Sequence, residues 1–180
     1  IDDKNWESSK ALWEIKEKIV QDDNLKSIFT TLDNIESIKT ELKKTNKGDE
    51  VLQDIEAYQK EYGYKGIYTH EYIYKLWVED PEPIYETLRN YIDSDYNFNE
   101  DQNKVVEAQK KAIENIRSLI NDAEDLEKFE QALNLALKMA PLTPDHHFYI
   151  DQGTYARLRI VIKELGKKFV ERGDLDNEED

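Results

Sequence analysis

The stretch WESSKALWEIKEKIV, residues 6–20, decides the fold class of this chain. Trp6, Trp13 and Val20 recur every seven residues, and Leu12 and Ile15 fall beside them. This spacing places the apolar side chains on one wide face of an α-helix. The stretch therefore predicts an amphipathic helix whose apolar face packs against neighbouring helices.

Helical spacing of apolar residues continues along most of the chain. It covers residues 25–42, 51–62, 84–92, 105–120, 126–140 and 148–169. Only 6 glycines and 4 prolines occur among the 180 residues, which is too few for the many turns of a strand-rich fold. We therefore predict an all-α fold of about six or seven helices, with residues 1–180 forming a single helical domain.

Glycine and proline residues mark the expected boundaries of these helices. Gly48 interrupts the apolar pattern, Gly63 is predicted to be a left-handed C-cap, and Pro83 suits the first turn of a helix. Thr143 followed by Pro144 predicts the N-cap and first position of the last long helix. These positions separate the predicted helices from one another.

Residues 63–83 differ from the rest of the chain. Two glycines and two prolines bound an aromatic run that has no clean helical period, and most of the 11 tyrosines lie between residues 58 and 96. Rings with polar tips can line a pocket for an organic substrate or seal a loop against helices. We predict one aromatic-rich ordered loop that is packed on the domain by its rings.

The composition excludes several classes of function. Lys plus Arg is 25 and Asp plus Glu is 40, which gives a formal net charge of −15. This balance disfavours binding to nucleic acid or to an anionic membrane surface. The chain has no cysteine, no apolar run of membrane-spanning length and no secretory signal. We expect a soluble, cytoplasmic protein.

Two chemical readings remain open for the sequence Asp145-His146-His147. It matches superficially the Asp-His-His motif of metal-dependent phosphoesterases, and His147 and Asp151 share a helical face, as two metal ligands could. The other reading is a polar cluster that orients loops at a helix N-terminus. Arg157 is a candidate to clamp a phosphate or carboxylate. Arg159 would point to a different helical face.

The sequence contains no nucleotide-binding glycine loop and no serine nucleophile elbow. We therefore expect that the chain holds no cofactor and cannot bind and cleave ATP by itself. Its first residue is Ile1 and its one methionine is Met139. We expect the chain to be a piece of a longer multidomain protein.

Two blocks of sequence together resemble a known family. The first contains EYGYK (61–65), His70 and WVEDP (77–81), and the second runs PLTPDHHFYIDQ (141–152) before Arg157 and a Gly166-containing segment. Their order and spacing resemble the central region of phosphoenolpyruvate-utilising phosphotransferases. This group includes atypical phosphoenolpyruvate synthases, rifampin phosphotransferase and phenylphosphate synthase. Lys65 departs from the arginine that is frequent in the family, and Pro144 from a glutamate.

The resemblance implies a division of labour between domains. In that family an ATP-grasp domain phosphorylates a histidine on a small swivelling domain, and the helical region joins these domains or binds the acceptor. This chain would then be a helical linker or substrate-binding domain, inactive by itself, and its partners would be the ATP-grasp domain, the phosphohistidine domain and a small-molecule acceptor. The parent protein would be a phosphotransferase dependent on ATP or phosphoenolpyruvate, using ATP and magnesium.

The resemblance also implies where the acceptor would bind. No residue is assigned as catalytic or as a metal ligand. The predicted substrate-binding residues are Asp145, His146, His147, Tyr149, Asp151, Arg157, His70 and Trp77. The alternative function is a non-catalytic, acidic helical interaction module. We call the aromatic-rich loop at residues 63–83 the tyrosine loop. The two functions differ in whether the Asp145–Asp151 turn and the tyrosine loop converge on a pocket.

Overall fold

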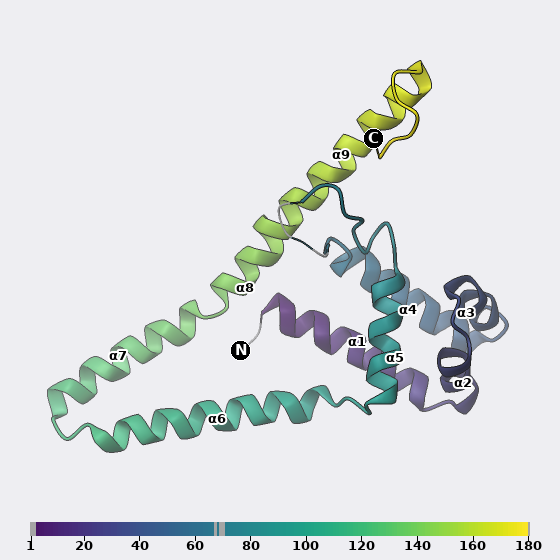
Figure 1. Ribbon diagram of the computed structural model, residues 1–180. Coiled ribbons are helices and arrows are strands. Elements are labelled where there is room, and N and C mark those ends of the chain that lie inside the picture. Colours follow the sequence, from purple (N-terminus) through teal and green to yellow (C-terminus); the bar gives the residue numbers. More distant parts are fainter. Residues whose placement is uncertain (1–2, 67, 69–70, 180) are drawn as a thin grey trace.

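A computed structural model describes residues 3–66, 68 and 71–179 (Figure 1). The predicted all-α fold is confirmed. About six or seven helices were expected, and the described part of the chain contains seven helices of nine or more residues, together with shorter ones. In that part, a single antiparallel bridge between Gly66 and Leu76 is all the β-structure there is. The helices are α1 (Lys4–Val20), α2 (Asp23–Thr31), α3 (Ile35–Leu42), α4 (Asn46–Tyr62), α5 (Glu82–Asp93), α6 (Phe98–Leu119), α7 (Ala123–Met139), α8 (Leu142–His146), the π-helix η1 (His147–Gln152) and α9 (Gly153–Arg172).

Helices α1 to α5 form the packed part of the molecule, which we call the bundle. Helix α1 begins at Asp3, whose side chain accepts hydrogen bonds from the backbone N–H groups of Asn5 and Trp6. It packs against α4 and α5, and α2 and α3 close the far end. Each fully buried Leu or Ile side chain contributes about 1.5–3 kcal/mol. The core is made of Leu12, Ile15, Ile19, Leu25, Ile28, Phe29, Ile38, Leu42, Val51, Leu52, Ile55, Tyr58, Ile84, Tyr85, Leu88 and Ile92.

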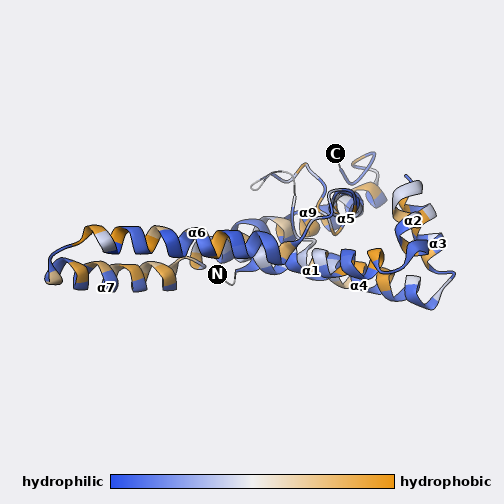
Figure 2. Ribbon diagram, turned by 90° about the horizontal axis from the view of Figure 1, so that it is seen from below, coloured by the Kyte–Doolittle hydropathy of each residue, from blue (hydrophilic) through white to orange (hydrophobic). Residues whose placement is uncertain are grey.

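Helices α6 and α7 extend away from the bundle, meet at a turn and diverge from it; we call them the arm (Figures 1 and 2). Phe98, at the base of α6, packs on the rings of Trp6 and Trp13. Beyond this residue the described side chains of α6 and α7 are exposed or only half-buried. The apolar spacing therefore predicts these helices correctly, although it does not bring their side chains into a core.

Three predicted boundaries are wrong. Residues 25–42 form two helices rather than one, because Asn34 caps α3 by accepting a hydrogen bond from the Ser37 backbone. Gly48 lies within the first turn of α4, where an added Cβ would stand 2.1 Å from the Leu42 carbonyl oxygen. Gly63 does cap α4, but its φ of −73° is right-handed. Close approach of backbone, rather than left-handed geometry, requires glycine at both positions.

Helices α8, η1 and α9 follow one another without a break. The predicted N-cap at Thr143 is wrong, because α8 already begins at Leu142 after Pro141. Pro83 does lie in the first turn of α5, as predicted. Helix α9 ends at Gly173, whose φ of +76° is left-handed. In the described residues we find no helix with the length and apolar character that crossing a membrane requires.

Candidate functional site

The two adjacent histidines lie at the start of the π-helix η1. The Nδ1 atom of His147 is 3.3 Å from Asp151 Oδ2. The side-chain amide nitrogen of Gln152, Nε2, is 3.2 Å from His147 Nε2. His146 Nδ1 lies 3.7 Å from the same carboxylate oxygen. The wider turn of a π-helix brings residue 152 next to residue 147, five positions earlier. Both ring nitrogens of His147 are therefore occupied, and its ring orientation is set by protein groups.

Asp145 joins the start of this segment to the bundle. Its carboxylate accepts a hydrogen bond of 2.9 Å from the backbone N–H of Lys4, at the first turn of α1. The Lys4 ammonium lies 5.9 Å from the centre of the Tyr149 ring and forms an ion pair of 2.6 Å with Glu7. Hydrogen bonds to Glu7 and Tyr149 raise the pKa of Lys4. Asp145 thus joins α8 to the first turn of α1.

A pocket lies where η1 and α9 meet the tyrosine loop. Its volume is about 190 Å³. The guanidinium of Arg157 lies 5.2 Å from the centre of the Tyr64 ring and donates a hydrogen bond to the Gly153 carbonyl. The lining residues are Lys60, Glu61, Tyr64, Phe148, Tyr149, Gly153 and Arg157. Two cations and one carboxylate give the pocket a local positive charge in a chain of net charge −15.

The pocket contains two of the predicted substrate-binding residues, Tyr149 and Arg157. His146, His147 and Asp151 form their own cluster beside it and do not line it. Trp77 is half-buried and packs against the bundle core. His70 lies outside the described residues. The tyrosine loop was expected near this site, but no local pattern predicts that Lys60 and Tyr64 lie next to Arg157, because their proximity depends on how the loop folds onto α9.

A buried ion cluster, which the sequence analysis missed, fixes the loop to α9. The Arg159 guanidinium lies 2.7 Å from Glu79 and 2.9 Å from Glu179, and it also donates to the Tyr72 carbonyl. Lys163 lies 2.9 Å from Glu79 and 2.7 Å from Glu179. Burial alone would raise the pKa of Glu79, but hydrogen bonds from Arg159, the Leu76 backbone and Lys163 lower it to about 2.

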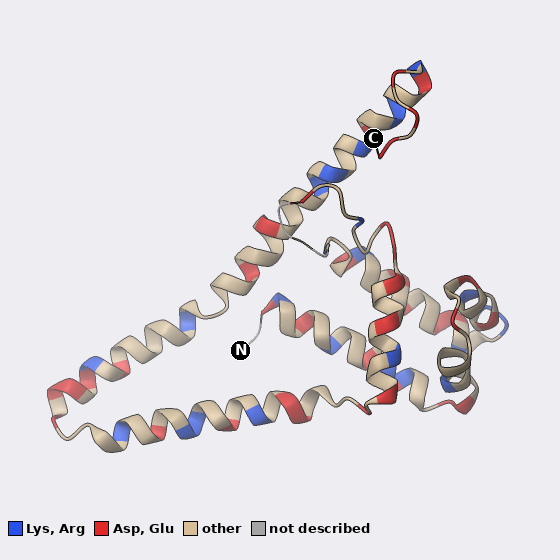
Figure 3. Ribbon diagram, in the orientation of Figure 1, with Lys and Arg blue, Asp and Glu red and all other residues tan. Residues whose placement is uncertain are grey.

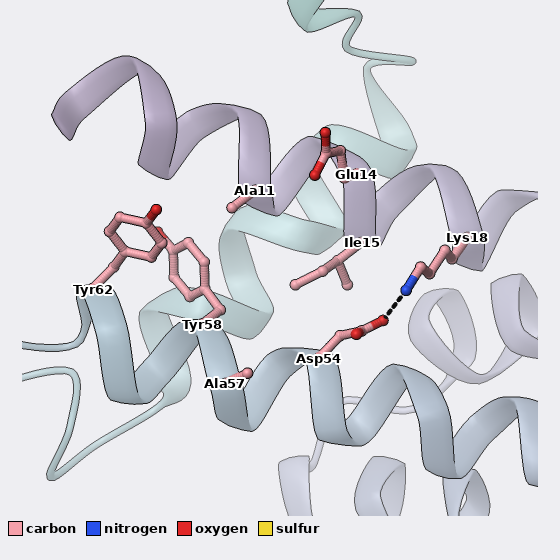
Figure 4. A pocket seen from close by; sticks show the side chains of 8 residues that line it. All are labelled: Ala11, Glu14, Ile15, Lys18, Asp54, Ala57, Tyr58 and Tyr62. Carbon is pink, nitrogen blue, oxygen red and sulfur yellow. Dashed lines mark hydrogen bonds and ion pairs between the residues drawn. The ribbon is translucent and has the colours of Figure 1, made fainter. Parts of the chain in front are cut away.

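A second hollow, of about 240 Å³, lies between α1 and α4 (Figure 4). Glu14 and Asp54 line it, and Lys18 forms an ion pair with Asp54 across it. Because phosphoryl groups are anionic, these carboxylates make it a poor site for phosphoryl transfer. Within the described residues, no group of three or more His, Asp or Glu side chains could hold a metal ion.

Comparison with known proteins places the chain in a family. Residues 3–143 match the model of the rifampicin phosphotransferase fourth domain. The chain belongs to this family. The matched segment contains the whole bundle, the arm and the tyrosine loop, and it ends just before Asp145. The resemblance to phosphoenolpyruvate-utilising phosphotransferases is thereby confirmed.

Two relatives extend the similarity through the pocket-forming helix. The chain is 28% identical over 177 residues to an uncharacterized phosphotransferase, YvkC, of Bacillus subtilis (strain 168). It is 25% identical over 168 residues to the chondramide synthase cmdD of Chondromyces crocatus. These alignments cover 98% and 92% of this chain but only 21% and 4% of the relatives. No solved structure matches the chain.

Proposed function

We propose that this phosphotransferase domain binds a small hydroxyl compound and positions it for phosphoryl transfer from a phosphohistidine domain outside the chain. The observation that carries the proposal is the pocket lined by Tyr64 of the loop and by Tyr149 and Arg157 of the following helices, in which Arg157 lies over the Tyr64 ring. These residues come from the two blocks of sequence that resemble the family. The pocket therefore joins parts of the chain that lie some 90 residues apart.

The chemistry of the pocket suits such an acceptor. The rings of Tyr64, Phe148 and Tyr149 offer apolar surface, and Arg157 and Lys60 offer positive charge. Phosphoryl transfer depends mainly on in-line geometry and on compensation of negative charge. The domain would supply the in-line geometry and the charge compensation without binding ATP. The cluster of His146, His147 and Asp151 would hold the neighbouring turn of the helix in place, as a set of positioning residues.

The remaining parts of the reaction would lie elsewhere in the parent protein. We propose an ATP-grasp domain and a swivelling phosphohistidine domain as partners, with ATP and magnesium as the parent's cofactors and the cytoplasm as its location. The relatives, of which the chain covers 21% and 4%, leave room for such domains. Transfer would be gated by the approach of the phosphohistidine domain to the pocket.

The test uses the full-length parent protein. Alcohols and phenols are first screened for compound-dependent ATP consumption, and the best compound then serves as acceptor. We expect Arg157→Gln to raise the KM for this acceptor about tenfold and to change kcat less, because a charge-assisted contact contributes about 1.5 kcal/mol or more. Arg172→Gln, at the exposed end of α9, is the matched control and should leave KM unchanged.

His147→Ala separates positioning from folding. Loss of its hydrogen bonds to Asp151 and Gln152 should raise KM while the circular dichroism spectrum stays that of the parent. If both Arg157→Gln and His147→Ala leave KM and kcat unchanged in a folded protein, the acceptor does not bind here. That outcome would favour the alternative function, an acidic interaction module. Figure 3 shows Asp and Glu spread along most of the helices rather than gathered in one part of the molecule, which does not favour that alternative.

A further inference from the structure

Arg157 differs from the other arginines of the chain in how its guanidinium is used. Its Nη1 atom donates one hydrogen bond of 3.1 Å to a backbone carbonyl, and no carboxylate of the described residues pairs with it. A carboxylate pairs with each of Arg117, Arg159 and Arg172. Arg89 donates from Nε and Nη2 to two backbone carbonyls. The Nε and Nη2 atoms of Arg157 have no such acceptor in the part of the chain that the structure describes.

The edge that Arg157 leaves unbonded is the one that binds carboxylates elsewhere in this chain. Arg159 donates from Nε and Nη2 to the two carboxylate oxygens of Glu79, at 2.7 and 3.2 Å. Arg117 uses the same two nitrogens on Glu130, at 2.5 and 2.8 Å. A planar guanidinium edge matches both oxygens of a carboxylate, and the two parallel hydrogen bonds give strength and specificity. Arg157 thus offers a fork for a carboxylate that the described chain does not supply.

The neighbours of Arg157 hold its guanidinium at the pocket. The guanidinium lies 5.2 Å from the centre of the Tyr64 ring, and Nη1 donates to the Gly153 carbonyl. A Cβ added to Gly153 would stand 2.9 Å from Nη1, which is closer than such atoms approach each other. The missing side chain of Gly153, at the junction of η1 and α9, therefore makes room for the guanidinium of Arg157.

A second cation lines the same pocket. Lys60, in the last turn of α4, forms no ion pair with any described residue. Glu61 also lines the pocket, but its carboxylate lies 3.8 Å from the Lys4 ammonium, which compensates its charge. The pocket thus contains two cations without an acidic partner, in a chain whose net charge is −15. A small anion is the ligand that balances them.

The rest of the pocket suits one aromatic ring. The rings of Phe148 and Tyr149 lie edge to face, with centres 5.1 Å apart, and both line the pocket together with Tyr64. Such rings offer apolar surface for offset or edge-on contact with another ring. The volume is about 190 Å³. Because a protein cavity of about 150 Å³ can hold benzene, a single ring with a small substituent fits this pocket.

We infer that the acceptor is a hydroxyaryl carboxylate, a single aromatic ring that bears both the hydroxyl to be phosphorylated and a carboxylate. The carboxylate binds the Nε and Nη2 edge of Arg157 with Lys60 nearby, and the ring packs beside Tyr64 and Tyr149. Phosphorylation of the hydroxyl rests on the proposed function. There the hydroxyl oxygen bonds to phosphorus, the phosphorus–nitrogen bond of the phosphohistidine breaks, and the hydroxyl proton goes to the released imidazole.

The test titrates the intact chain with 4-hydroxybenzoate and with 4-hydroxybenzamide, its uncharged isostere, and follows binding by NMR. We expect the carboxylate to bind about tenfold more tightly, because it gains charge-assisted hydrogen bonds from Arg157. Equal dissociation constants for the two compounds would overturn the inference. Inorganic phosphate is titrated in parallel. If it binds as tightly as 4-hydroxybenzoate, the cations serve the transferred phosphoryl group rather than the acceptor, and the inference is again overturned.

Three variants assign the preference for the carboxylate to the guanidinium edge. Arg157→Gln should remove the tenfold preference. Gly153→Ala keeps every charge but displaces the guanidinium, and it should reduce the preference while the circular dichroism spectrum stays that of the parent. Lys111→Gln is the control, because Lys111 is an exposed lysine of α6 without an ion pair, and it should leave the preference unchanged. A preference that survives Arg157→Gln would place the carboxylate elsewhere and refute the inference.

Turnover by the full-length parent protein separates this inference from the proposed function. A lower KM for 4-hydroxybenzoate than for 4-hydroxybenzamide supports both. Equal KM values that rise together in Arg157→Gln would keep the proposed function and overturn the inference. Binding of 4-hydroxybenzoate that depends on Arg157, without its phosphorylation or that of any hydroxyl compound, would overturn the proposed function and leave the carboxylate site.

Discussion

The bundle and the arm are built from the same kind of sequence but use it differently. Leu88 in α5 and Leu137 in α7 both lie on apolar helical faces, yet Leu88 is 0% exposed and Leu137 is 41% exposed. Helix α5 packs against α1 and α2, whereas α7 lies outside the bundle and diverges from α6 (Figures 1 and 2). Amphipathic spacing thus specifies a helix, while burial depends on whether a neighbouring element covers its apolar face.

The test with the largest expected effect replaces one leucine by alanine in the bundle and one in the arm. We expect Leu88→Ala to lower the free energy of unfolding by about 3 kcal/mol, because it leaves a cavity in a packed core. Leu137→Ala should lower it by about 1 kcal/mol or less, because its side chain is already partly in water. Urea denaturation followed by circular dichroism measures both. Equal losses would mean that the arm is covered in solution.

A second test concerns the ion cluster that fixes the tyrosine loop to α9. Glu79→Gln should lower the free energy of unfolding by about 2 kcal/mol at pH 7, because Arg159 and Lys163 lose a shared carboxylate in a mostly buried site. The folded pKa of Glu79, about 2, is below its ordinary value of 4.5. Its contribution is therefore complete above pH 4.5 and is lost as the pH falls toward 2.

The control for this test is the pH dependence of the variant itself. Between pH 4.5 and 2 the parent chain should lose stability more steeply than Glu79→Gln, since the variant has no carboxylate to protonate at this position. Parallel curves would show that the carboxylate contributes nothing to stability. Glu164→Gln, which removes an exposed carboxylate on α9, should follow the parent curve more closely.

The smallest effect is expected in the arm. Arg117 and Glu130 form a two-pronged ion pair of 2.5 and 2.8 Å near the turn between α6 and α7, but both side chains are more than 40% exposed. Solvent and salt screen such pairs, so Arg117→Gln should leave the urea midpoint unchanged within error. A clear loss of stability that disappears in 1 M salt would show that the arm is held closed by charge.

Much of the fold could be predicted from the sequence because helix formation is largely local. The spacing of Trp6, Trp13 and Val20 predicts α1, and Pro83 correctly predicts the first turn of α5. The predictions at Gly48 and Gly63 are wrong because these glycines permit close approach to the Leu42 carbonyl and to the backbone of Val78. Such contacts depend on distant residues, which a local pattern does not contain.

In the candidate site, too, the sequence predicts local features but not the contacts between distant residues. The sequence alone predicts Tyr149 and Arg157 as binding residues, and it predicts that His147 lies one helical turn from Asp151. It placed Arg157 and Arg159 on different faces, and in the structure Arg157 faces Tyr64 while Arg159 is buried against Glu79. It could not predict the π-helix, which brings Gln152 to His147.

By itself the sequence determined that this chain is helical, acidic and related to phosphotransferases, because periodicity, composition and motif order are read along the chain. Tertiary structure alone decided that the apolar faces of α1 to α5 close into a core while those of the arm stay exposed. It also decided that Tyr64 meets Arg157 and that Lys65 lies against Ser8. The physical reason is that burial and proximity are properties of pairs of surfaces, which form only when distant segments pack together.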